Sequence, residues 1–326
     1  MLKGKKPEPQ EKRLKIFIYG PAGVGKTIAS LQFPNAYVID CEKGTDHYTE
    51  TICKANSAVL QTLLPGEVKA EIRELIVTKH PYKTLIIDPI TQVYNAIQEE
   101  WRNKYGIQAK KEGKNELEDY GMGIWGKIKK DYKAIQRMLL TIDMNVIITA
   151  HQKDVYGNNF SKLGTTFDSA KGDDYFFDLI FQIVKKGDKR MAITIKERAE
   201  IGKNKFPETF EWSYENFTKY YGKEIIEKES TPVEMADKNT VGRVKNMVNL
   251  LRLDDGIVDK WFQKAEVDAW DDMPKVTIEK CEKYLNALLS KAQGGQDTLK
   301  TATEGTEQPK KGGKIAKTKD TAKGAQ

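Results

Sequence analysis

The chain has 326 residues, of which 39% are apolar, 31% are charged and 9% are aromatic. This apolar share can bury the core of one large domain, or of a medium domain and a small one, which excludes a wholly disordered or fibrous protein. Apolar runs such as Leu85–Ile87 and Val146–Ile148 are far too short to cross a bilayer, and residues 1–13 lack the apolar stretch of a signal peptide. We therefore expect a soluble protein that acts in the cytoplasm.

The net charge of +7 lies mostly at the two ends of the chain, because residues 1–13 and residues 293–326 each carry a net charge of +3. Such basic ends suit weak, salt-sensitive attraction to nucleic acid, although solvated tails that aid solubility have the same composition. The three cysteines form no CxxC pair, which argues against a zinc knuckle and predicts reduced thiols.

Between Leu14 and Glu224, short runs of Ile, Val, Leu and Phe alternate with stretches that can form helices. Runs of this length and composition are typical of strands that are buried on both faces of a sheet. We expect strands at Leu14–Tyr19, Tyr37–Ile39, Leu85–Ile87, Asn145–Thr149 and Leu179–Val184, and helices at Ile28–Phe33, Ile90–Tyr105 and Gly123–Ile142. This alternation predicts an α/β fold with a mostly parallel central sheet. The turn at Lys186–Asp188 predicts an antiparallel edge hairpin that includes Met191–Ile195.

The C-terminal part of the chain has a different pattern. Apolar residues recur at helical spacing from Val241 to Leu251 and from Ile278 to Leu289, and Asp254 precedes a shorter third helix. From Gln293 onward there is almost no large apolar residue, which predicts disorder. The predicted organisation is a basic N-terminal tail (1–13), an α/β domain (14–224), a linker (225–239), a small helical module (240–292) and a disordered basic tail (293–326).

The strongest motif is the sequence GPAGVGKT directly after the first predicted strand. It fits the pattern GxxxxGK[ST], in which glycines let backbone N–H groups wrap around phosphates at a helix N-terminus. Lys26 would neutralise the β- and γ-phosphates, and Thr27 would coordinate Mg²⁺ through its hydroxyl. The motif therefore predicts that ATP is bound, with Mg²⁺, by Gly20, Pro21, Ala22, Gly23, Val24, Gly25, Lys26, Thr27 and Ile28.

Carboxylates that could act on the metal ion and on water follow two other predicted strands. Asp88 ends the run TLIID and is the expected Walker B ligand of Mg²⁺, with helix capping as the plain alternative. Pro89 follows it, so the adjacent residue cannot be the catalytic base, as it is in many ring-forming ATPases. Asp40 and Glu42, just past the second strand, are the candidates to orient or deprotonate the attacking water.

A phosphate loop followed by a short second strand that ends in Asp-x-Glu resembles the RecA-like ATPases. In particular, the sequence resembles the phage-encoded RecA-like ATPases of the single-strand annealing and recombination group. The resemblance implies that Glu42 is the catalytic base, with Asp40 as the less favoured candidate. It also implies that a basic residue on the edge hairpin, Lys196 or Arg198, reaches the γ-phosphate of a neighbouring subunit.

The same resemblance assigns roles around the end of the fourth predicted strand. There His151 or Gln152 would sense the γ-phosphate and report the nucleotide state to the loop that follows. That loop, from Lys153 to Asp174, would touch single-stranded DNA, with its lysines on the backbone and its aromatic residues stacked on bases. These aromatic residues are Tyr156, Phe160 and Phe167.

The sequence thus predicts an oligomeric ATPase that uses ATP and Mg²⁺ to act on single-stranded DNA in phage recombination or replication, with hydrolysis stimulated by DNA. A nucleotide-gated adaptor, such as a helicase loader with slow hydrolysis, is the alternative. A P-loop kinase is less favoured, because the longest insert, Lys104–Asp119, has none of the arginines of a kinase lid.

Overall fold

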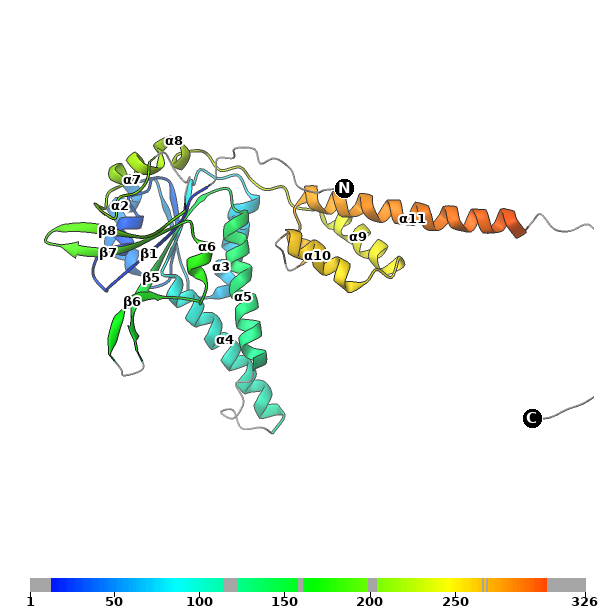
Figure 1. The fold of residues 1–326 in the computed structure, drawn as a ribbon, viewed down its shortest axis with the longest axis horizontal. Helices are drawn as coiled ribbons and strands as arrows, with labels where there is room; N and C mark the ends of the chain where they lie inside the picture. The colour runs from blue at the N-terminus through cyan, green and yellow to red at the C-terminus, as the bar shows by residue number, and fades with distance from the viewer. Residues whose placement is uncertain are drawn as a thin grey trace, which may run out of the picture.

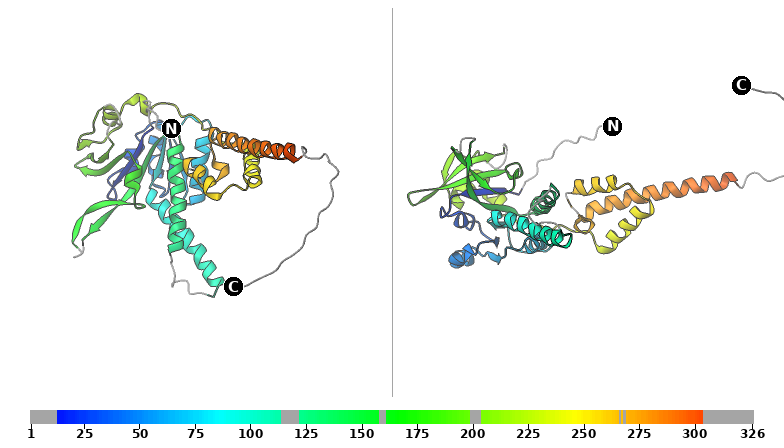
Figure 2. Two further views of the ribbon diagram at one scale, coloured as in Figure 1. Left: turned by 45° about the vertical axis from the view of Figure 1, so that its right-hand side comes forward. Right: turned by 90° about the horizontal axis from the view of Figure 1, so that it is seen from below.

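The computed structural model describes residues 13–113, 122–157, 161–198, 204–265, 267 and 269–303, and of these only the backbone for 122 and 291–303. Its centre is a nine-stranded sheet in the order β3-β2-β4-β5-β1-β7-β8-β9, with β6 paired to β5. Helices cover both faces of the sheet, and the C-terminal helices lie to one side of this α/β part in every view (Figures 1 and 2). None of the helices in the described ranges is long and apolar enough to cross a membrane.

Six strands form the parallel part of the sheet. β1 lies between β5 and β7, with Ile16 opposite both Ile147 and Leu179. Every residue of β1 and of β4 is buried, as expected for strands that are covered on both faces. The six strands are β1 (Lys15–Gly20), β2 (Ala36–Asp40), β3 (Ala58–Gln61), β4 (Thr84–Asp88), β5 (Asn145–Tyr156) and β7 (Leu179–Lys186).

Three further strands are antiparallel to their neighbours. β8 (Lys189–Glu197) returns along β7, and β9 (Thr209–Glu211) pairs with β8 at the edge of the sheet. β6 (Lys162–Asp168) pairs with the C-terminal half of β5. The predicted α/β class, the mostly parallel sheet and the antiparallel edge hairpin are therefore confirmed.

Alternation along the strands builds two cores on opposite faces of the sheet, so that Phe17 and Tyr19 belong to one core and Ile16 and Ile18 to the other. The first core is covered by α3 (Pro65–Val77), α4 (Ile90–Lys111) and α5 (Met122–Thr141). The second is covered by α1 (Lys26–Ser30), α2 (Thr49–Lys54), α7 (Tyr214–Tyr221) and α8 (Lys223–Ile226). Short helices η1 (Gly44–Tyr48) and α6 (Asp173–Phe176) lie in the connections.

The segment after β5 forms a hairpin where the sequence predicts a long loop over Lys153–Asp174. β5 continues to Tyr156 and pairs with β6, which places His151 opposite Asp168. The prediction of a loop is wrong because the backbone of β5 past Ala150 still offers N–H and C=O groups, and β6 pairs with them. The hairpin projects from the sheet in Figure 1.

The C-terminal helices α9 (Lys238–Leu250), α10 (Asp255–Ala265) and α11 (Lys275–Thr303), with the turn η2 (Trp270–Asp272), enclose a separate small core. This core supports the predicted helical module, whose boundaries at 240 and 292 stay a prediction. α11 continues past Gln293, the predicted start of the disordered tail, because its Lys, Gln and Ala residues can extend an existing helix. Residues 1–12 and 304–326 of the predicted tails lie outside the described residues.

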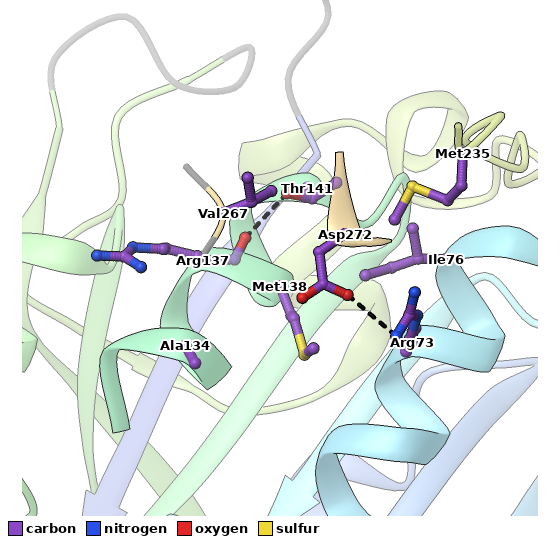
Figure 3. Close-up of a pocket in the computed structure, with 9 residues that line it drawn as sticks. All are labelled: Arg73, Ile76, Ala134, Arg137, Met138, Thr141, Met235, Val267 and Asp272. Atoms are coloured by element: carbon purple, nitrogen blue, oxygen red, sulfur yellow. Dashed lines mark hydrogen bonds and ion pairs between the residues drawn. The ribbon is translucent and has the colours of Figure 1, made fainter. Parts of the chain in front are cut away.

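A small apolar cavity of about 50 Å³ lies where the C-terminal helices meet α3 and α5 (Figure 3). Arg73 of α3 forms an ion pair with Asp272 of η2, with 3.0 Å between Nη1 and Oδ1, and donates a hydrogen bond of 2.7 Å to the carbonyl oxygen of Asp271. Because α3 and α5 lead into β4 and β5, this junction lies on the side of the amino ends of the parallel strands.

Candidate nucleotide-binding site

A second cavity, of about 510 Å³, opens at the carboxyl ends of the central strands. The loop that leaves β1 borders it, with φ angles of 74° at Gly23 and 89° at Gly25 that favour glycine. At Gly20 a Cβ atom would lie 2.4 Å from the carbonyl oxygen of Ile183, so the close approach of β1 and β7 also requires glycine. The cavity is lined by Gly20, Ala22, Gly23, Gly25, Lys26, Thr27, Glu42, Tyr48, Asp88, Pro89, His151, Gln152 and Arg190.

Most of the predicted phosphate-binding residues line this cavity. Pro21, Val24 and Ile28 are not among its lining side chains, and Val24 packs into the core under the loop. Lys26 Nζ donates hydrogen bonds to the carbonyl oxygens of Gly20 at 3.1 Å and of Pro21 at 3.0 Å. Burial lowers the pKa of Lys26, whereas the nearby carboxylates of Asp88 and Glu42 act to raise it. An anionic phosphate would give this ammonium group a stronger acceptor than the neutral carbonyls.

Asp88 lies at the end of β4 and is only 6% exposed. Its carboxylate accepts hydrogen bonds from the hydroxyls of Thr149 and Thr27. Burial raises the pKa of Asp88, and the Asp40 carboxylate acts in the same direction, against the opposing effects of these hydrogen bonds and of the Lys26 ammonium group. A buried carboxylate beside a threonine hydroxyl is a suitable pair of oxygen ligands for Mg²⁺, so Thr27 and Asp88 could hold this ion together with phosphate oxygens.

The two candidates for the catalytic base differ in their surroundings. Asp40 is 2% exposed, and its carboxylate accepts hydrogen bonds from the backbone N–H groups of Glu42 at 3.0 Å, Gly44 at 3.2 Å and Thr45 at 2.9 Å. These bonds fix the turn after β2 and occupy the carboxylate. The side chain of Glu42 is 40% exposed and lines the cavity. This geometry favours Glu42 over Asp40 as the group that acts on water.

His151 and a glutamine from α4 restrain Glu42. His151 Nε2 lies 3.0 Å from Glu42 Oε1, and Gln92 Nε2 donates a hydrogen bond of 2.7 Å to the same oxygen. Gln92 was not a predicted site residue, because nothing in the sequence of a helix indicates which polar residue faces the site. The contact between His151 and Glu42 joins the predicted γ-phosphate sensor directly to the predicted catalytic base.

Hydrogen bonds also connect the proposed sensors to the β5–β6 hairpin. The hydroxyl of Thr91 accepts a bond from the N–H of His151 at 3.0 Å and donates one to the carbonyl oxygen of Asp168 at 2.6 Å. Gln182 Nε2 donates to Gln152 Oε1 at 2.9 Å and lies 3.3 Å from the hydroxyl of Thr165 in β6. The hairpin is therefore tied to both residues at the end of the buried part of β5.

The predicted basic finger residues lie at the other end of the sheet. Lys196 pairs with Ile180, close to the start of β7, and its Nζ donates to the carbonyl oxygens of Asp174 and Phe177. Arg198 donates to the carbonyl oxygen of Tyr175 at 2.7 Å and forms an ion pair with Asp178, with 3.0 Å between Nη1 and Oδ1. The structure thus places neither residue near the phosphate loop of its own chain.

Arg190 is the basic residue of this hairpin that does reach the cavity. It lies directly after the β7–β8 turn, at the carboxyl end of β7. The basic residues predicted from the sequence were only those at the far end of the hairpin. The length of the turn could have indicated Arg190, because a tight turn after β7 places the first residues of β8 beside the loop that follows β1.

The three aromatic residues that were predicted to stack on DNA bases do not share one surface. Phe167 packs against Phe17 of the first core, with 4.7 Å between the ring centroids, so it cannot stack on a base without leaving the core. Tyr156 is 58% exposed on the hairpin. Phe160 lies outside the described residues. The lysines of the hairpin are paired, Lys153 with Asp168 at 3.1 Å and Lys162 with Asp154 at 2.8 Å.

Comparison with known proteins found one family model and several similar solved structures. The crystal structure of the RadB recombinase is similar over 60% of this chain and 84% of the RadB chain, at 15% sequence identity and a TM-score of 0.37. No curated protein matches the chain. A family model described as an AAA domain matches residues 12–206, which is more than half of the chain and includes the phosphate loop, Asp88 and His151. The chain therefore belongs to the AAA domain family and is a P-loop ATPase by class.

Proposed function

We propose that this protein hydrolyses ATP in the cavity at the carboxyl ends of β1, β2, β4 and β5. The observation that carries the proposal is that one cavity brings together Lys26, Thr27, Asp88 and Glu42. Lys26 would hold the β- and γ-phosphates, and Glu42 would orient the water that attacks the γ-phosphate. Thr27 and Asp88 would hold Mg²⁺, which neutralises phosphate charge when bound.

Phosphate release from ATP by the purified full-length chain tests this proposal. We expect release that requires Mg²⁺ and that falls to background in the presence of excess EDTA. The assay should be run with and without single-stranded DNA. A parent protein that releases no phosphate in either condition would contradict the proposed hydrolysis.

We further propose that hydrolysis serves the handling of single-stranded DNA in recombination or replication of the phage type, in the host cytoplasm. The β5–β6 hairpin projects from the sheet and is bonded through Thr91 to His151, which contacts Glu42. A change in the position of the hairpin on DNA would reach the proposed base through this short chain of contacts. DNA-stimulated turnover follows from that connection.

Fluorescence anisotropy with a labelled single-stranded oligonucleotide tests the DNA proposal. Tyr156→Ala should weaken binding at all salt concentrations, at roughly 1–3 kcal/mol for a lost stacked base, and Tyr175→Ala is the matched control on an exposed tyrosine outside the hairpin. Removing residues 304–326 should instead flatten the salt dependence, because it removes lysines that act through counterion release. Binding that is the same with an ATP analogue, with ADP and without nucleotide would count against a nucleotide-dependent DNA reader.

The protein is also proposed to act as a homo-oligomer. Any contribution of Lys196 or Arg198 to hydrolysis must then be made in a neighbouring subunit, because both lie at the end of the sheet opposite their own phosphate loop. Mixing inactive Arg198→Ala and Lys26→Ala proteins should restore part of the activity at mixed interfaces. Full activity of a strictly monomeric protein at all concentrations would contradict this arrangement.

A nucleotide-gated adaptor is the second candidate function. The observation that favours it is the double restraint on Glu42 Oε1 by His151 and Gln92, which would slow hydrolysis and let bound ATP persist as a signal. The two functions differ in their response to DNA. Turnover that rises with single-stranded DNA supports the DNA-handling ATPase, and turnover that stays slow with DNA supports the adaptor.

A further inference from the structure

Arg190 occupies an unusual position for a charged residue. It is the second residue of β8 and lies opposite Lys185 of β7, so the β7–β8 turn holds it at the carboxyl edge of the sheet. Its guanidinium covers Gly25 of the phosphate loop, where a Cβ atom would lie 2.2 Å from Arg190 Nε. A side chain at position 25 would therefore displace Arg190 as well as strain the loop.

Within the described ranges this guanidinium has no partner of its own. Its Nε is buried without a hydrogen-bond acceptor, and in the described part of the chain the side chain forms no hydrogen bond or ion pair. The adjacent Lys189 binds Glu211, with 2.6 Å between Nζ and Oε2, so the nearest β9 carboxylate is already used. A half-buried cation without an anion is unfavourable, and the positive charge beside the phosphate loop is suited to an anionic ligand.

The sheet order indicates which end of a nucleotide Arg190 would meet. Asp88 and His151 are on β4 and β5, and Glu42 follows β2, all on one side of β1. Arg190 is on β8, on the other side of β1. The carboxylates mark the side of the metal ion and the γ-phosphate, which leaves the β7–β8 side for the nucleoside end.

We propose that Arg190 binds the phosphate nearest the nucleoside, in its own chain, and so recognises the part that nucleoside diphosphates and triphosphates share. This inference rests on the proposed nucleotide site and adds a binding residue to it. The contact would be a charge-assisted hydrogen bond from the guanidinium to a phosphate oxygen. Arg190 would then determine affinity for nucleotide and would not contribute selectively to hydrolysis.

The test measures dissociation constants of MgATP and MgADP for the full-length parent, Arg190→Ala, Arg190→Gln and Arg190→Lys with fluorescent nucleotide analogues. The first two variants should bind both nucleotides about tenfold more weakly, the loss expected for one charged hydrogen bond, and Arg190→Lys should recover part of it. The rate at saturating ATP should change by less than about twofold. Lys186→Ala, on an exposed lysine of the same hairpin, is the matched control and should bind like the parent.

The outcomes separate this inference from the proposed hydrolysis. If the parent binds both nucleotides and hydrolyses neither, hydrolysis is contradicted while the affinity comparison still tests Arg190. Unchanged affinities in both Arg190→Ala and Arg190→Gln would overturn the inference. So would a loss confined to ATP, or a large fall in rate with unchanged affinity, since either result places Arg190 at the γ-phosphate. Circular dichroism of each variant verifies that the fold is retained.

Discussion

At the amino ends of the parallel strands Lys15 is bound within the chain, whereas at the carboxyl ends Lys26 lines an open cavity. Lys15, at the start of β1, donates to the carbonyl oxygens of Met144 at 3.1 Å and Ile142 at 3.4 Å, just after the C-terminus of α5. Lys26, at the start of α1, donates to the carbonyl oxygens of Gly20 and Pro21 at the other end of β1. The two lysines flank the same strand in opposite settings.

The difference follows from the direction of the parallel strands. Helix C-termini lead into the amino ends of the strands, and their carbonyl oxygens satisfy cations such as Lys15. The carboxyl ends lead into helix N-termini, whose N–H groups remain available for an anionic ligand. We therefore expect substitutions at the carboxyl edge to change ligand binding and turnover, and substitutions at the amino edge to change stability.

The largest effect is expected from Lys26→Ala at the carboxyl edge. It removes the positive charge at the β- and γ-phosphates, and should lower the rate of ATP hydrolysis by about 10³-fold or more with little change in thermal stability. Phosphate release and a thermal melt measure the two quantities. Lys54→Ala, on an exposed lysine that pairs with Glu50, is the control. Hydrolysis by Lys26→Ala at the parent rate would show that the site is assigned wrongly.

Glu42→Gln should separate nucleotide binding from chemistry. Loss of a general base lowers turnover by about 10²-fold, while the dissociation constant of MgATP should stay close to that of the parent. Single-turnover hydrolysis and equilibrium binding provide the measurements, with Glu50→Gln as the control on an exposed glutamate. If Glu42→Gln is active and Asp40→Asn is not, the role belongs to Asp40.

Lys15→Met tests the amino edge. Burial lowers the pKa of Lys15 to about 7, so between this value and the ordinary pKa of lysine the unfolded chain binds more protons than the folded chain. The buried charge therefore destabilises the fold at pH 7 and below, and the effect fades as the pH rises toward about 10.4. Lys15→Met should raise the free energy of unfolding by about 1–3 kcal/mol at pH 6 and by less at pH 9.

Urea unfolding of Lys15→Met and of the parent at several pH values measures this difference. The affinity for MgATP should be the same in both proteins, since Lys15 lies at the other end of β1 from the phosphate loop. A stabilisation that grows with pH would contradict the sign of the expected effect.

The smallest effect is expected from Arg13→Ala. Arg13 Nε lies 2.8 Å from Asp143 Oδ1, and although burial acts to raise the pKa of Asp143, hydrogen bonds from Arg13 and Thr231 lower it overall. The stabilisation is present at neutral pH and is lost as the pH falls through the folded-state pKa of Asp143. Arg13→Ala should cost about 0.5–1 kcal/mol near pH 7, because the pair is partly exposed and screened by solvent. Urea midpoints of Arg13→Ala and of the parent, at pH 7 and in acid, measure this cost. A cost that is larger in acid than at pH 7 would contradict the expected effect.

The parallel strands could be predicted from the sequence because strands buried on both faces have a distinctive composition, and the phosphate loop because its chemistry requires a fixed spacing. β3 escaped prediction since three of its four residues are half buried and the fourth is exposed, a pattern that resembles a connection. The β5–β6 hairpin depends on pairing between segments, which composition alone does not specify. Arg190 was missed for the same reason, because its place beside Gly25 follows from the β7–β8 turn.

Hydrogen–deuterium exchange of the full-length chain, with and without Mg²⁺ and a non-hydrolysable ATP analogue, tests the contrast between the two edges most directly. We predict slower exchange in peptides that cover residues 20–28, 40–45 and 186–191, and unchanged exchange in peptides that cover residues 13–16 and 142–146. Protection concentrated at the amino edge, or no protection of residues 20–28 at a saturating concentration of the analogue, would contradict the assignment of the carboxyl edge as the nucleotide site.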